Sequence, residues 1–179
     1  TPANMNEEAL VLLSEKCHPF LQNLVNEVHE TAKISVLSNL GCYVLAKIEG
    51  TANLRISVEN GTVFPLHAGA ASKILLTTLG IEGIHKYFEK KPERYTPYTI
   101  VSEPEMLEEL KKISDDGFSI DLGEYIEGIG AVACPIKDKY NRIIAAVSIA
   151  FPIFLSPQEK AMRLFPPLKK CSELLSTIW

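Results

Sequence analysis

The chain has 179 residues, a length that fits one domain, or one domain with an appendage. Apolar residues make up 46% of it and charged residues 22%, an ordinary balance for a globular protein that excludes a disordered tail. Its 18 basic and 22 acidic residues give a net charge of −4. This balance argues against a nucleic-acid surface in this chain, because phosphate binding needs clustered Lys and Arg.

Cysteines and histidines show no pattern of a metal or redox site. Cys17, Cys42, Cys134 and Cys171 lie far apart without CxxC spacing, and no HExxH pair occurs. We therefore expect buried free thiols in a reducing cytosol, a cytoplasmic protein, and no metal or cofactor. The longest nearly apolar run, residues 143–151, is too short to span a bilayer, so no membrane partner is expected.

The first 28 residues favour two helices. Residues 4–17 fit a helix that opens with a capping box at residues 4–7 and has one apolar face: Leu10, Leu13 and Cys17. Pro19 is predicted to interrupt it and to begin a second helix. The first helix has no evident place in a compact core, so we expect a linker.

From residue 33 the apolar period changes from 3.6 to 2, which indicates strands. Residues 33–36 and 42–48 are predicted strands joined by a turn at residues 39–41. Residues 54–59 alternate in the same way, and Asn60-Gly61 follows directly. This dipeptide predicts a hairpin with residues 62–66 as the returning strand.

The middle of the chain favours helices. Small residues at 67–72 run into a predicted helix over residues 73–79, and a short helix follows around residues 81–88. A capping box at residues 102–105 opens a third helix, for which Gly117 is a natural left-handed stop.

The C-terminal third returns to strands and ends in a helix. Residues 118–122, 131–137 and 142–151 are predicted strands, the last two joined by a hairpin at residues 138–141. A final helix opens at Ser156, and Pro166-Pro167 is predicted to kink or break it. Hairpins dominate the strand connections, so the fold class is α+β, a largely antiparallel sheet with helices packed on it.

Three stretches together resemble the effector-binding domain of the IclR family of bacterial transcriptional regulators. They are FPLHAGAASKILL at residues 64–76, LKKISDDGFSIDLGE at 110–124 continuing into GIGAVACPI at 128–136, and IAAVSI at 144–149. The resemblance implies a fold similar to GAF and profilin domains, with a central antiparallel sheet flanked by helices.

The resemblance also implies a domain order and partners. Residues 1–18 would be a linker helix to a winged helix-turn-helix domain missing from this sequence, and residues 19–179 the effector-binding domain. Operator DNA would be bound only through that missing domain. Family members form dimers or tetramers, so we expect this chain to bind copies of itself.

The same resemblance implies an effector pocket. Its apolar wall would comprise Leu54, Ile56, Phe64, Ile129, Ala131 and Ala150, which are inward-alternating positions. Its polar groups would be the backbone N–H groups of Ala70, Ala71 and Ser72 at a helix start, the hydroxyl of Ser148, and Asp121. Such a pocket suits a small organic acid or a monocyclic aromatic acid. The helix start would take the carboxylate, and Asp121 a hydroxyl of the ligand.

Other interpretations stay open beside this one. Lys73 is predicted to be a solvated lysine in a first helical turn. The GxGxxA pattern at residues 128–133 is a poor dinucleotide signal because no helix follows it, so its glycines are assigned to a tight strand entry. An enzyme is not expected, since no GxSxG, SxxK or metal cluster occurs. The alternative is a freestanding GAF-like small-molecule sensor that acts on a protein partner.

Overall fold

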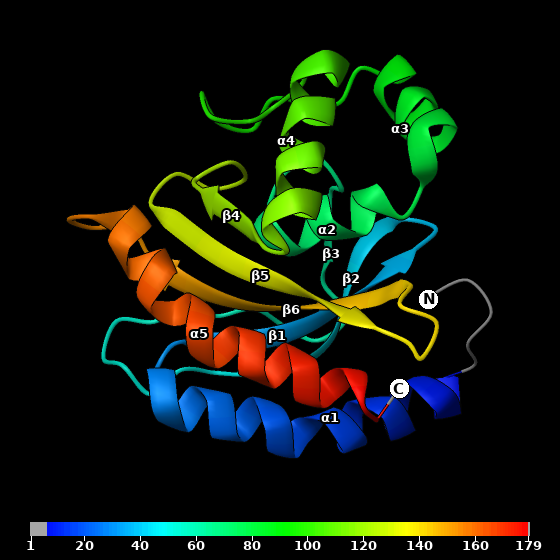
Figure 1. Ribbon diagram of the computed structural model, residues 1–179. Helices are drawn as coiled ribbons and strands as arrows, with labels where there is room; N and C mark the ends of the chain where they lie inside the picture. Colours follow the sequence, from blue (N-terminus) through cyan, green and yellow to red (C-terminus); the bar gives the residue numbers. More distant parts are fainter. Residues whose placement is uncertain (1–6, 179) are drawn as a thin grey trace.

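The computed structural model describes residues 7–178, which form a six-stranded sheet with helices on both faces (Figure 1). The strands lie in the order β3-β2-β1-β6-β5-β4, and every pairing is antiparallel. The strands are β1 (Thr31–Ser38), β2 (Gly41–Ile48), β3 (Val63–Phe64), β4 (Ser119–Leu122), β5 (Ile129–Lys137) and β6 (Ile143–Pro152). The predicted α+β fold is confirmed.

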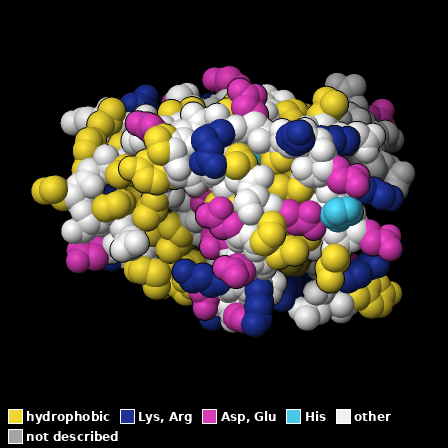
Figure 2. Space-filling view, turned by 90° about the horizontal axis from the view of Figure 1, so that it is seen from above, with side chains coloured by type: hydrophobic (Ala, Val, Ile, Leu, Met, Phe, Trp, Pro, Cys, Tyr) yellow, Lys and Arg dark blue, Asp and Glu magenta, His cyan; other side chains and the backbone are white. Residues whose placement is uncertain are grey.

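The helices divide between the two faces of the sheet. The long helices α1 (Glu7–Val28) and α5 (Pro157–Ser176) run side by side over one face. The shorter helices α2 (Ala70–Thr77), α3 (Gly80–Glu89) and α4 (Glu103–Asp116) lie on the other (Figure 1). Seen from the side of α3 and α4, acidic and basic side chains are interspersed over the surface (Figure 2). No helix within residues 7–178 is long and apolar enough to cross a membrane.

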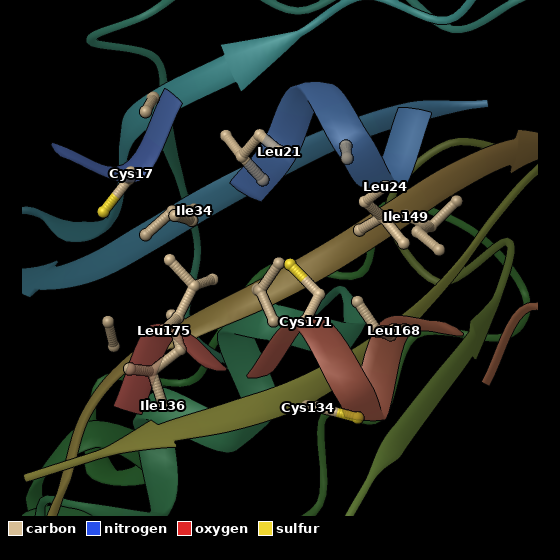
Figure 3. Close-up of a cluster of buried hydrophobic side chains, with 14 of the residues drawn as sticks. Cys17, Leu21, Leu24, Ile34, Cys134, Ile136, Ile149, Leu168, Cys171 and Leu175 are labelled. Atoms are coloured by element: carbon tan, nitrogen blue, oxygen red, sulfur yellow. The ribbon is translucent and has the colours of Figure 1, made fainter. Parts of the chain in front are cut away.

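One hydrophobic core fills the space between the sheet and the helices α1 and α5 (Figure 3). Fully buried side chains from both helices meet the strands there, among them Leu21 of α1, Ile149 of β6 and Leu168 of α5. A second core lies between the sheet and α2, α3 and α4. The four cysteines are all free and buried, as predicted.

The predicted break at Pro19 is wrong, because α1 continues through it. A proline inside a helix removes one donor and crowds the carbonyl four residues back. Cys17 and Leu21 flank Pro19 and are fully buried against the sheet, so tertiary packing offsets that cost. Leu10 is also buried, so this end of α1 packs on the same core. The predicted capping box at residues 4–7 begins outside the described residues.

The predicted break in the last helix is wrong for the same reason. Helix α5 continues through Pro166 and Pro167. Leu164 and Leu168 on either side of the two prolines are buried in the core, which holds both halves of the helix on the sheet.

The predicted hairpin at Asn60-Gly61 is also wrong. Residues 51–62 contain no strand, and β3 is only two residues long. The Gly61 N–H instead donates to the Val44 carbonyl at 2.8 Å, and the Val44 N–H to the Thr62 carbonyl at 2.9 Å. The Thr31 hydroxyl donates to the Ile56 carbonyl, and this bond holds residues 51–62 against β1. These bonds hold residues 51–62 across the sheet instead of leaving them to pair with their own neighbours.

Other turns and strand entries agree with the sequence. The β5–β6 hairpin forms as predicted, and the Asp138 carboxylate accepts from the Tyr140 and Arg142 N–H groups inside it. Gly117 ends α4 with a φ of 78°. Gly130 in β5 has the ring of Phe151 against it, at 2.7 Å from where a Cβ would lie. The glycine therefore serves the close strand packing that the sequence predicts.

Candidate functional site

A cavity of about 110 Å³ lies between the sheet and the start of α2. This is room for several water molecules, or for a small ligand. Ten of the eleven predicted pocket residues line it: Ile56, Phe64, Ala70, Ala71, Ser72, Asp121, Ile129, Ala131, Ser148 and Ala150. They come from five strands or loops and one helix that lie far apart in the sequence, so only the fold brings them together.

Leu54 is the exception among the predicted residues. Its side chain is 60% exposed and does not line the cavity. The prediction assumed a strand over residues 54–59, whereas this segment has no strand partner. The segment reaches the cavity only at Ile56, and the consecutive residues Ile56, Ser57 and Val58 all line it, so no alternation is present.

Small side chains on neighbouring strands form the floor of the cavity. Ala131 of β5 lies directly opposite Ala150 of β6, and Asp121 of β4 lies directly opposite Ala131. Cross-strand partners point to the same face of a sheet. The two alanines therefore leave open space above the sheet between Asp121 and β1.

The start of α2 forms one wall, and part of it already holds a carboxylate. The Gly69 N–H donates to Glu124 Oε2 at 3.1 Å. Gly69 itself has a φ of 112°, which favours glycine at this entry to the helix. Ala70, Ala71 and Ser72 are buried against the cavity. The predicted donors thus lie at the pocket, beside a carboxylate of the protein.

The prediction that Lys73 is solvated is wrong. Its side chain is 0% exposed, and Nζ donates to Glu109 Oε1 at 2.7 Å, to the Ile120 carbonyl at 2.9 Å and to Glu124 Oε1 at 2.5 Å. Burial alone would lower the pKa of Lys73, but Glu124 and Glu109 outweigh burial and raise it. The sequence holds a signal for this, because residues 70–76 are apolar or small on all sides, and a lysine in such a helix needs a partner.

Asp121 is buried at the edge of the cavity, with only 6% of its surface exposed. Its Oδ1 accepts from the N–H groups of Gly123 and Glu124 at 2.9 and 2.7 Å. Burial raises the pKa of Asp121, although these hydrogen bonds and the nearby lysines oppose it. Burial likewise raises the pKa of Glu124 to about 7, against the effect of Lys73. The carboxyl groups of Asp121 and Glu124 therefore both bind a proton more tightly than solvent-exposed carboxyl groups do.

Ser148 is a fully buried residue of the cavity whose hydroxyl lacks a partner. It is 0% exposed to solvent, and its hydroxyl has no hydrogen bond to any residue that the structure describes. The sequence leaves open whether this hydroxyl bonds to a neighbouring carbonyl or to a ligand. The bond to a carbonyl does not form, and Ser148 faces the cavity.

Lys33 is a pocket residue that the sequence analysis missed. It lines the cavity from β1, directly opposite Ser148 of β6. Its Nζ lies 4.2 Å from the centre of the Phe64 ring, and it makes no ion pair or hydrogen bond within residues 7–178. Burial lowers the pKa of Lys33, which Asp121 opposes. The sequence carries no clear signal for this, because the alternation at residues 33–36 places Lys33 on the same face of the strand as Ser35, as a solvent-facing lysine would be.

A metal site is absent from the part of the chain described, where no group of three or more His, Cys, Asp or Glu side chains could hold an ion. The arrangement is that of a binding pocket. Mostly apolar walls surround a floor that carries Lys33, Asp121 and Ser148, and Ser57, Ser72 and Tyr125 add hydroxyl groups to the lining.

Comparisons with known proteins agree with this architecture. Residues 10–177 match the family model described as bacterial transcriptional regulator IclR C-terminal. The transcriptional repressor IclR of Escherichia coli is 33% identical over 139 residues, which are 76% of this chain and 51% of that protein. The curated relatives of this kind are regulators rather than enzymes.

Solved structures share the fold. The IclR structure from Thermotoga maritima has a TM-score of 0.83 at 24% identity, covering 92% of this chain and 67% of that one. An IclR homologue from Microbacterium hydrocarbonoxydans, solved in complex with 4-hydroxybenzoate, has a TM-score of 0.81 at 20% identity, covering 94% and 68%. The chain spans about half the length of the curated relatives it matches. With the family model matched over nearly all of its residues, this chain belongs to the IclR family and corresponds to the C-terminal domain of these bacterial transcriptional regulators.

Proposed function

We propose that this chain is the effector-sensing and self-associating part of an IclR-type bacterial transcriptional regulator, and that its effector is a small organic or monocyclic aromatic acid. The effector enters the cavity beside α2. Operator DNA is bound by a winged-helix domain of the longer protein and not by this chain, whose net charge is −4.

The observation that carries the proposal is the unpartnered hydroxyl of Ser148. A buried hydroxyl without a hydrogen bond costs about 1–3 kcal/mol. Ser35 and Ser119 are also buried without a hydrogen bond among the described residues, but of these three serines only Ser148 lines the cavity. This one faces a cavity lined by ten residues that the sequence predicts for an effector site. A ligand oxygen at this place would remove the cost.

The chemistry of the walls selects the class of ligand. Ile56, Phe64, Ile129 and the floor alanines are apolar and suit a carbon skeleton or a ring. Asp121 repels a carboxylate while it is ionised and accepts a hydrogen bond from a hydroxyl. A hydroxylated or keto acid therefore fits better than a plain fatty acid. The homologue with bound 4-hydroxybenzoate supports this class.

Calorimetry with purified chain and a panel of small acids tests the proposal. The panel contains pyruvate, succinate, benzoate and 4-hydroxybenzoate. We expect at least one of them to bind, and Ala71→Leu to abolish that binding, because the larger side chain fills a cavity of about 110 Å³. Ser148→Ala should weaken it by about 1–2 kcal/mol.

Ser114→Ala is the matched control, since Ser114 lies on α4 and bonds to the Leu110 carbonyl outside the pocket. It should leave binding unchanged. Equal binding by the unmodified chain, Ala71→Leu and Ser148→Ala would place the effector elsewhere, and binding of none of the acids would overturn the proposed class of effector.

A further inference from the structure

Three lysines lie on or beside the face of the sheet that carries the pocket, and only one lacks an anionic partner. Lys73 is neutralised by Glu109 and Glu124. Lys47 lies opposite Lys33 on β2 and has Glu59 at 4.0 Å. Lys33 has the Phe64 ring at 4.2 Å but no ion pair within the described residues. Lys33 is half-buried and lines the cavity without an anionic partner, so a carboxylate bound there would gain a charged hydrogen bond.

Ser148 places a second donor beside Lys33. The two residues are directly opposed in the β1–β6 pairing, and both line the cavity. Directly opposed residues have Cβ atoms about 4.5–5.5 Å apart. A carboxylate held between them can accept from Lys33 Nζ with one oxygen and from the Ser148 hydroxyl with the other. This would give a partner to the Ser148 hydroxyl and an anion to Lys33, neither of which has one among the described residues.

The start of α2 is a weaker place for the same carboxylate. Glu124 already accepts from the Gly69 N–H there, at 3.1 Å. A second carboxylate at this helix end would approach the charge of Glu124, and like charges repel. Lys73 cannot relieve that repulsion, because both of its glutamate partners already engage it.

Asp121 marks the opposite end of the ligand. It lies on β4, three strands away from β1, which is about 14 Å between strand axes. The side chains of Lys33 and Asp121 span part of this distance. The small side chains of Ala131 and Ala150 leave the remaining space open for a ligand. A ligand that reaches both ends needs its acid group and its hydroxyl at opposite ends of a small skeleton.

We infer that Lys33, together with Ser148, binds the carboxylate of the effector, and that the effector lies across the floor with a hydroxyl toward Asp121. The class is a monocyclic hydroxy acid with the two groups at opposite ends. This inference rests on the proposed function. It adds that Lys33 is the charged residue that makes the pocket prefer an acid over a neutral analogue.

Paired ligands test the assignment. Calorimetry compares 4-hydroxybenzoate and 4-hydroxyphenylacetate with their neutral amides, on the unmodified chain and on Lys33→Met. We expect the unmodified chain to prefer each acid over its amide. Lys33→Met should weaken the acids about 10- to 100-fold, the size expected for a charged hydrogen bond, and change the amides less than about threefold. Lys33→Arg should keep the preference for the acid.

Lys47→Met is the matched control, because Lys47 lies across from Lys33 on the neighbouring strand and has its own glutamate. It should leave both ligands unaffected. Thermal unfolding of each variant checks that it is folded. If Lys33→Met does not fold, Lys33→Gln, which also removes the charge, takes its place in the test.

The outcomes separate the two proposals. Equal loss of acid and amide in Lys33→Met, or no loss of the acid, overturns the role of Lys33. Binding of only pyruvate or succinate leaves the proposed function standing and overturns the assigned ligand class. If no acid binds at all, both fall.

Discussion

At the residue scale, Lys73 and Glu124 form an ion pair with almost no access to water. Removing two charges from water costs several kcal/mol each, and their attraction offsets this only when every remaining donor and acceptor is bonded. The polar atoms are bonded: Lys73 makes three hydrogen bonds, and the second oxygen of Glu124 binds the Gly69 N–H. Burial nevertheless outweighs Lys73 at Glu124 and raises its pKa to about 7, so the pair is fully ionised only above that pH. The pair ties α2 to the β4 turn at one wall of the cavity.

Lys73→Met should lower the free energy of unfolding by about 3–5 kcal/mol at pH 8, because it leaves two carboxylates without their cation. Urea denaturation measures this. The double variant Lys73→Met with Glu124→Gln should recover part of the loss. A loss below about 1 kcal/mol in the single variant would mean that the ion pair contributes little.

The raised pKa of Glu124 predicts a pH dependence of stability. Burial raises this pKa from 4.5 to about 7, so the folded chain binds the proton more tightly than the unfolded chain. The resulting stabilisation is fully present below pH 4.5 and is lost as the pH rises through 7. We expect Glu124 to contribute up to about 3 kcal/mol to this decline.

Urea denaturation at pH 5 and pH 8 checks this for the unmodified chain and for Glu124→Gln. The variant should lose less stability over this range, since its side chain does not titrate. If both proteins lose the same free energy of unfolding between pH 5 and pH 8, Glu124 is not the titrating group. Glu127→Gln, which changes another glutamate of the same turn, is the control.

At the element scale, the entry to β5 depends on the absence of a side chain at Gly130. A Cβ there would lie 2.7 Å from the Phe151 ring and 3.2 Å from the Asp121 carbonyl. Phe151 is fully buried in the core under α1 and α5 and cannot move freely. The absence of a side chain at Gly130 therefore allows β5 to pair with both β4 and β6, next to the residues that form the floor of the cavity.

Gly130→Ala should therefore lower the free energy of unfolding by about 1–3 kcal/mol, the usual cost of overpacking a core. Gly80→Ala is a useful contrast, because nothing lies within 4 Å of its added Cβ and any loss there comes from its φ of 67° alone. Denaturation of both variants separates crowding from backbone strain. Gly130→Ala with unchanged stability would show that the Phe151 ring yields without cost.

At the scale of the whole molecule, helix α1 carries apolar side chains on two sides. Leu10 packs into the core, whereas Val11 and Leu12 are exposed. Single exposed apolar residues are normal on a protein surface, whereas adjacent ones can belong to a contact surface. We therefore expect the proposed self-association to use this side of α1.

We expect sedimentation at micromolar concentration to show a dimer or a larger assembly. Leu12→Glu should shift it toward monomer by placing a charge in the contact. Leu40→Glu is the control, since Leu40 is more exposed and lies in the β1–β2 turn. A monomer in the unmodified chain would count against self-association, and equal effects of both variants would count against α1.

The sequence alone determined most of the strands, although its hairpin at Asn60-Gly61 was wrong. Alternation over residues 33–36 and the mostly apolar runs at 42–48, 131–137 and 142–151 are local signals, and these four segments coincide with β1, β2, β5 and β6. A glycine placed the end of α4 at Gly117, and the polar run at residues 138–141 placed the β5–β6 turn, for equally local reasons. The family resemblance added ten residues that the fold gathers around one cavity, although their role in binding stays a prediction.

The tertiary structure decided what depends on distant partners. Helices α1 and α5 continue through their prolines because buried neighbours hold both halves on the sheet. Residues 51–62 lie across the sheet because Thr31 and Val44 bind them. Lys73 is paired and Lys33 is not, although both are lysines among small or apolar neighbours in the sequence. The free energy of a buried charge depends on which anions lie within a few ångströms, and these come from residues more than thirty positions away.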